Sequence, residues 1–104
     1  RRGQANPFFM KIVWSPESRH DLTQLYAYIA LDNPQAGQAM VERIILLVED
    51  SLPRFPQLGP IGRVPGTREL VVPGTPYIVP YRVKAQTIEV VRVYHAARRW
   101  PDIL

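Results

Sequence analysis

The feature that most constrains the fold of this chain is a pair of apolar stripes at helical spacing in its first half. Apolar side chains recur every three or four positions between residues 16 and 31, and again between residues 34 and 52. Ser15 can cap the first helix, and the Asp-Asn-Pro turn at residues 32–34 ends it and starts the second. The tight turn predicts two antiparallel helices, whose apolar stripes contain Leu22, Leu25, Tyr26, Ile29, Met40, Ile44, Leu47 and Val48.

Short runs of β-branched and aromatic residues flank the predicted hairpin on both sides. Short links join the last three runs, which predicts an antiparallel meander. Pro80 lacks the N–H that a ladder bond requires, so we expect a bulge or locally unpaired backbone there. The four predicted strands are residues 11–14, 67–72, 77–83 and 87–94.

A connection rich in proline and glycine separates the hairpin from the last three strands. It holds five prolines and three glycines between residues 53 and 73, which indicates an irregular backbone. We expect Phe55, Leu58 and Ile61 to anchor this connection. The order β-α-α-β-β-β predicts an α+β fold, with a helical hairpin packed on one face of a small, mainly antiparallel sheet.

Length and composition exclude several classes of protein. The chain of 104 residues suffices for one hydrophobic core, so residues 10–104 are predicted to form a single domain and residues 1–9 an upstream extension or a cloning remnant. It has no cysteine and two histidines, so we expect no disulfide, no metal and no cofactor. No apolar stretch reaches the roughly 20 residues that span a membrane. A soluble protein of the reducing cytoplasm fits this composition.

Charge is distributed unevenly along the chain, although the formal net charge is only +4. Residues 10–52 contain three basic and six acidic side chains, whereas residues 53–104 contain eight basic and three acidic ones. The positive second half could attract phosphates or an acidic segment of another protein.

Five segments form a series along the chain: KIVWSPES, a helix ending in LDNP, PQLGPIGRVPGTREL, VVPGTPYIVPYRV and the closing VYHAARRWP. In this order they resemble the ParE branch of the RelE/ParE toxin superfamily, and the resemblance covers residues 10–104. It implies a bacterial type II toxin that arrests growth. The resemblance also implies a partner, an antitoxin encoded beside the toxin, which neutralises it in a hetero-oligomeric complex.

The branches of this superfamily act differently, and a few residues favour one of them. RelE-like members cleave mRNA on the ribosome, which requires a base and cations beside the scissile phosphate. In an approximate alignment Arg68 could supply one cation, but Leu70 and Ile78 occupy the two other positions. His95 resembles the terminal histidine of other ribosome-dependent relatives, whereas residues 53–66 lack the glutamate that accompanies it there. The resemblance therefore favours a non-enzymatic inhibitor of DNA gyrase, as ParE-like members are. The alternatives are a ribosome-dependent ribonuclease and a bare nucleic-acid-binding module.

Two sets of residues are candidates for binding sites. By the ParE resemblance the closing segment is predicted to contact DNA gyrase. A histidine at this place is more often a packed or hydrogen-bonded residue than a catalyst. The arginines could equally form a solvated face, and the tryptophan could pack on the core instead of serving as an anchor. An antitoxin helix with an extended strand could cover an apolar and basic strip, with acidic side chains reaching the arginines. The predicted gyrase-binding residues are His95, Arg98, Arg99 and Trp100. The predicted antitoxin-binding residues are Phe55, Leu58, Ile61, Arg63, Arg68, Val71 and Val72.

Overall fold

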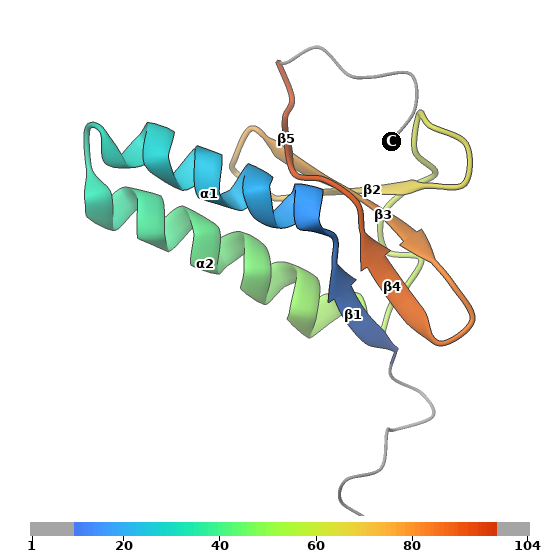
Figure 1. Cartoon of the computed structure of the whole chain (residues 1–104). Coiled ribbons are helices and arrows are strands. Elements are labelled where there is room, and N and C mark those ends of the chain that lie inside the picture. The colour runs from blue at the N-terminus through green and yellow to red at the C-terminus, as the bar shows by residue number, and fades with distance from the viewer. Residues whose placement is uncertain (1–9, 98–104) are drawn as a thin grey trace, which may run out of the picture.

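The computed structural model describes residues 10–97 as a helical hairpin layered on a five-stranded sheet (Figure 1). The hairpin consists of α1 (Pro16–Ala30) and α2 (Pro34–Ser51), and strand β1 (Lys11–Trp14) leads directly into it. The remaining strands are β2 (Arg68–Val71), β3 (Tyr77–Val83), β4 (Thr87–Val90) and β5 (Tyr94–His95). The predicted α+β fold is confirmed.

Side-chain caps set where both helices begin. The hydroxyl of Ser15 accepts a hydrogen bond from the N–H of Ser18 at 2.9 Å, and the side-chain oxygen of Asn33 accepts one from the N–H of Ala36 at 3.1 Å. A proline follows each cap at the first helical position, where its missing N–H breaks no helical hydrogen bond. The Ser15 hydroxyl also donates to the carbonyl of Val91 at 2.7 Å, which fastens the start of α1 to the chain after β4.

The sheet has the strand order β1-β4-β3-β2, and β5 also pairs with β3. The predicted antiparallel meander of β2, β3 and β4 is confirmed, whereas β1 runs parallel to β4 and makes the sheet mixed. The order places β2 at one edge, next to the long connection that precedes it.

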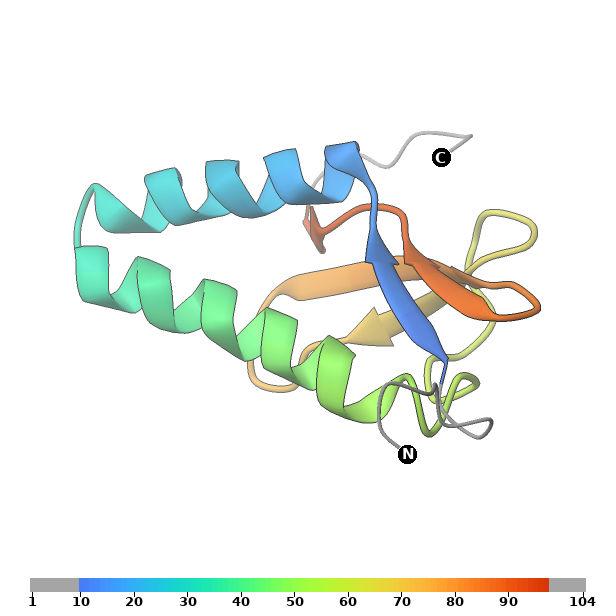
Figure 2. The ribbon, with the colours of Figure 1, turned by 60° about the horizontal axis from the view of Figure 1, so that its bottom comes forward.

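Figure 2 shows the hairpin lying along one side of the sheet, and the core fills the space between the two layers. From α2, Ile44 and Val48 are fully buried, and α1 contributes Leu22 and Leu25. From β3 the ring of Tyr81 is fully buried among them. Within the described residues, neither helix is both long enough and apolar enough to cross a membrane.

Tyr26 was predicted to belong to the core stripe of α1, and this prediction is wrong because its side chain is 40% exposed. Its ring lies against α2 at Gly37, where an added Cβ atom would come within 3.1 Å of the Cδ1 of Tyr26. The glycine lets the two helices approach closely, and Tyr26 therefore lies where they meet rather than between them and the sheet.

The last predicted strand is divided in the structure, which corrects that prediction. β4 ends at Val90, opposite Tyr81, and β5 begins at Tyr94, opposite Ile78. Three residues of this stretch therefore face two residues of β3, which is a bulge. The expected interruption at Pro80 is confirmed, because the missing N–H of this proline leaves the ladder without a donor at this point.

Hydrogen bonds from the Tyr81 side chain to the loop backbone hold the loop at residues 53–66, rather than the apolar side chains predicted to anchor it. Tyr81 donates a hydrogen bond from its hydroxyl to the carbonyl of Pro56 at 2.7 Å and accepts one from the N–H of Gly59 at 2.9 Å. Because the helices already cover the inner face of the sheet, the loop is bound at the edge of the sheet. The three predicted anchors are each at least half exposed: Phe55, Leu58 and Ile61.

Candidate functional site

An apolar groove of about 260 Å³ lies between α2, the loop and β2. It brings together Leu58 and Val71, two of the predicted antitoxin-binding residues, whose side chains are 50% and 54% exposed. We call it the edge groove, because β2 is the edge strand of the sheet. Its lining consists of Leu47, Leu58, Gly59, Pro60, Leu70, Val71 and Pro73.

A second groove, of about 390 Å³, lies where the loop turns into β2, and we call it the loop groove. It contains the predicted residues Ile61 and Arg68 together with Val83, which the sequence reasoning missed. Val83 shares its strand phase with the buried Tyr81, so the pattern predicts burial for it, yet it is 41% exposed. The lining consists of Gln57, Ile61, Gly66, Thr67, Arg68 and Val83.

The loop covers only part of the outer edge of β2. The N–H of Glu69 donates to the carbonyl of Pro60 at 2.9 Å, and Ile61 forms an isolated antiparallel bridge with Arg68. Beyond this point, no strand among residues 10–97 pairs with the outer side of Val71. An uncovered piece of sheet edge therefore lies beside the edge groove.

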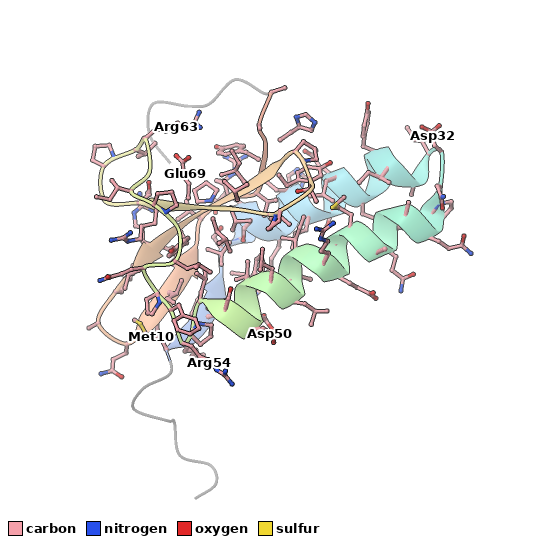
Figure 3. The ribbon with its side chains drawn as sticks, turned by 180° about the vertical axis from the view of Figure 1, so that it is seen from behind. Met10, Asp32, Asp50, Arg54, Arg63 and Glu69 are labelled. Carbon is pink, nitrogen blue, oxygen red and sulfur yellow. The ribbon has the colours of Figure 1, made fainter. Side chains whose placement is uncertain are left out.

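The two arginines of the predicted antitoxin strip both shape the loop. Arg63 donates from its Nε to the carboxylate of Glu69 at 3.1 Å, and its backbone N–H donates to the same oxygen at 2.8 Å. Figure 3 shows this pair far from Asp32, which marks the tip of the hairpin. Arg68 donates to the carbonyl of Gly59 at 2.8 Å. Of the two, Arg63 is the more accessible to a partner, with 49% of its side chain exposed.

Two other predicted antitoxin-binding residues lie outside both grooves. Val72 is completely buried in the core, where its backbone N–H donates to the carbonyl of Tyr77 at 3.0 Å. Its side chain therefore cannot belong to a binding surface, and the prediction that Val72 binds the antitoxin is wrong. Phe55 is 60% exposed but does not line either groove.

The predicted gyrase-binding segment begins in β5. His95 pairs with Tyr77 of β3, and the two rings meet edge to face with their centroids 5.6 Å apart. The Nδ1 of His95 accepts a hydrogen bond from the N–H of Ala97 at 3.2 Å. The three other predicted residues lie outside the described part of the chain: Arg98, Arg99 and Trp100.

An ion pair that the sequence reasoning missed joins α1 to the chain between β4 and β5. Arg92 donates from its Nε and Nη2 to the two carboxylate oxygens of Asp21, at 2.8 and 3.1 Å. These hydrogen bonds raise the pKa of Arg92 above its usual value. One signal in the sequence could have indicated the pair: Asp21 lies four residues before Leu25 on the apolar stripe, and a carboxylate there requires a buried partner.

The positions that a ribonuclease would use do not converge in the structure. Arg68 and Leu70 point to the helix side of the sheet, in phase with Tyr81 and Val79, whereas Ile78 points to the opposite side. In this chain the three positions therefore do not form one phosphate-binding site. Among residues 10–97, no three histidine, aspartate or glutamate side chains are grouped to hold a metal ion.

A further groove, of about 510 Å³, lies between α1 and α2 and was not predicted from the sequence. The exposed position of Tyr26 helps to form it, and the helical pattern had assigned that residue to the core. Its lining consists of Leu22, Thr23, Tyr26, Gln38, Val41 and Glu42.

Comparison with known proteins matches nearly the whole chain to one family. The model of the family described as the ParE toxin of the type II toxin–antitoxin system parDE matches residues 12–100. Y4kP of Sinorhizobium fredii, which is named as a toxin, is 39% identical over 94 residues, spanning 90% of this chain and 96% of that protein. Toxin RelE2 of Caulobacter vibrioides is 34% identical over 88 residues, spanning 85% of this chain and 97% of the relative.

Two solved structures share the fold of this chain. The chromosomal ParDE toxin–antitoxin system of P. aeruginosa contains a chain that superposes with a TM-score of 0.76 at 27% identity, covering 85% of this chain and 97% of that one. A chain of the toxin–antitoxin complex RelBE2 of Mycobacterium tuberculosis superposes with a TM-score of 0.65 at 22% identity, covering 91% of this chain and 100% of that one. The second likeness concerns the fold alone.

Proposed function

The chain belongs to the ParE toxin family of type II toxin–antitoxin systems, and we propose that it inhibits DNA gyrase and that a cognate antitoxin neutralises it. The observation that carries the choice of gyrase over RNA is the placement of Leu70 and Ile78. These residues occupy two positions where the resemblance would place the cations of a ribonuclease, and they lie on opposite faces of the sheet. Leu70 is also buried in the core. Neither apolar side chain can bind a phosphate. An inhibitor that acts by binding gyrase needs no cation at these two positions.

The antitoxin is proposed to bind along β2 and the loop. An extended antitoxin segment can pair with the uncovered edge at Val71 and place apolar side chains in the edge groove and the loop groove. The ParDE structure of P. aeruginosa is that of a toxin–antitoxin system, which supports a partner of this kind. The predicted residues that remain candidates for this contact are Leu58, Ile61, Arg63, Arg68 and Val71, with Phe55 beside them.

Charge favours an acidic partner at this surface. Residues 53–104, which contain the loop and β2, carry eight basic against three acidic side chains. Arg63 has half of its side chain exposed beside Glu69, so a second carboxylate can approach it from the antitoxin. Such rim charges chiefly accelerate association and select the partner, while the grooves supply most of the affinity.

The closing segment is proposed to contact gyrase. It follows β5, which pairs with β3, so it starts from an ordered base and loses less entropy on binding. Its composition suits a gyrase–DNA complex, because a guanidinium can pair with a carboxylate, pair with a phosphate or stack on a ring. The proposed gyrase contacts are His95, Arg98, Arg99 and Trp100.

Truncation tests this assignment directly. A chain ending at Ala97 keeps all residues of β5 and both antitoxin grooves, but it loses most of the proposed gyrase contact. We expect it to bind the antitoxin like the full chain and to lose growth arrest when expressed alone. Antitoxin affinity serves as the folding control. Growth arrest at the level of the full chain would contradict the assignment of the closing segment to gyrase.

A further inference from the structure

The carboxylate of Asp21 accepts three hydrogen bonds from a segment 71 residues further along the chain. Two come from the guanidinium of Arg92, at 2.8 and 3.1 Å, and the third comes from the backbone N–H of Val93 at 2.9 Å. Only 9% of the Asp21 side chain is exposed. We call Asp21, Arg92 and the N–H of Val93 the latch.

The latch holds the segment of residues 91–93, where the hydrogen-bond ladder of the sheet is interrupted. Between β4 and β5 the ladder is interrupted at the bulge opposite Pro80. Val91, at the start of this segment, donates to the carbonyl of Pro80 at 2.9 Å and accepts from the hydroxyl of Ser15. The next two residues are bound from the other side, by Asp21 of α1.

The guanidinium also fixes the residue that opens β5. Its central carbon lies 4.8 Å from the centroid of the Tyr94 ring, a cation–π distance. Tyr94 and His95 then pair with Ile78 and Tyr77. The position of the His95 ring over Tyr77 therefore depends on a chain of contacts that begins at Asp21.

The ion pair is partly buried, with 31% of the Arg92 side chain exposed. The cost of removing the Asp21 carboxylate from water offsets part of the attraction, so the pair by itself contributes little to stability. A bidentate pair with an added backbone donor instead fixes direction as well as distance. We propose that Asp21 and Arg92 are positioning residues, which set the start of β5 and so present His95 and the residues after it to the target. This inference rests on the proposed function, in which the closing segment contacts gyrase.

Asp21→Asn tests the latch with little change in volume. The asparagine amide would turn a donor toward the donors of Arg92, so the bidentate pair is lost. Glu17→Gln is the matched control, because it removes a carboxylate one turn earlier on α1 whose effect on Arg92 is only long-range. Three readouts are needed: the nuclear Overhauser effect between the rings of His95 and Tyr77, inhibition of gyrase, and antitoxin affinity.

For Asp21→Asn we expect loss of the Tyr77–His95 contact and inhibition weakened about tenfold or more, in line with a lost charged hydrogen bond. Antitoxin affinity should stay within about twofold, because the proposed grooves lie on the other side of β3. Glu17→Gln should match the wild type in all three readouts. Should Asp21→Asn fail to fold, Arg92→Lys replaces it, since lysine keeps the charge without the bidentate geometry.

Two results would overturn the inference: an unchanged ring contact in the folded variant, or a lost contact with full inhibition. If the wild-type protein itself leaves gyrase active, the proposed function fails. The ring contact then still decides whether the latch positions His95.

Discussion

The hydroxyl of Tyr81 is one of the points at which the sheet holds the loop that contains Leu58 and Ile61. It donates to the carbonyl of Pro56 and accepts from the N–H of Gly59. Tyr81→Phe keeps the buried ring and removes both hydrogen bonds, so we expect the free energy of unfolding to fall by about 1–3 kcal/mol. Urea unfolding at neutral pH measures this change. A midpoint equal to that of the wild type would contradict the role of the hydroxyl.

Alkaline pH offers a second readout of the same substitution. Burial raises the pKa of Tyr81 above its ordinary value of 10.0, and burial also raises the pKa of Tyr94. The unfolded chain therefore loses these protons first as the pH rises. This contribution to the free energy of unfolding is complete below about pH 10 and is lost as the pH rises further. Tyr81→Phe should reduce the alkaline loss without abolishing it, because Tyr94 remains.

Leu70 and Ile78 predict that the protein does not cleave RNA at a useful rate. Removal of one electrostatic stabiliser of a transition state typically lowers the rate by about 10²–10³-fold, and here two of the expected cations are replaced by apolar residues. Ribosomes programmed with mRNA should therefore show no new mRNA ends after incubation with the toxin. Robust cleavage that His95→Ala abolishes would instead favour the ribonuclease alternative.

At the scale of elements, the loop and β2 together form the surface proposed for the antitoxin. Leu58→Asp places a charge in the edge groove, so we expect antitoxin affinity to fall by about 1–3 kcal/mol, or roughly tenfold to a hundredfold. Leu31→Asp is the matched control, since Leu31 is 83% exposed at the tip of the hairpin and lines neither groove. Calorimetric titration with the adjacent gene product measures both. Equal affinities for the two variants would place the antitoxin elsewhere.

The helices could be predicted from the sequence because their signals are local. Ser15 and the following proline lie next to each other in the chain, and the apolar stripes repeat within each helix. Pro80 predicts an interruption of the ladder, but the division of the last strand into β4 and β5 could not be predicted in this way. Its cause combines a proline in β3 with a carboxylate of α1, which is 71 residues from Arg92. Only the folded chain brings these groups together.

The candidate site was predictable to a similar extent. Leu58, Ile61 and Val71 were singled out as apolar residues in or beside an irregular segment, and they are indeed exposed around the loop. Val72 follows Val71 directly, but its side chain points to the opposite face of the sheet and into the core. Neighbouring side chains of a strand point to opposite faces, which explains this difference. The prediction from the sequence instead assigned both residues to the antitoxin-binding surface. The groove between the helices depends on the close approach at Gly37, which no local pattern indicates.

At the scale of the whole molecule, β3 separates the two proposed binding surfaces. β2 with the loop pairs on one side of it, and β5 pairs on the other. Positive charge is concentrated in the half of the chain that contains both surfaces. This arrangement explains why we expect toxicity and antitoxin binding to be separable by mutation.

A supercoiling assay tests most directly whether this toxin inhibits gyrase by binding, as proposed. Purified gyrase, relaxed plasmid and ATP are incubated with increasing amounts of the full chain, and both supercoiled and linear DNA are measured. We predict that supercoiling falls, that linear DNA trapped by gyrase accumulates, and that prior addition of the antitoxin prevents both effects. The chain ending at Ala97 should have neither effect. Full supercoiling at a large excess of folded, antitoxin-binding toxin would contradict the account.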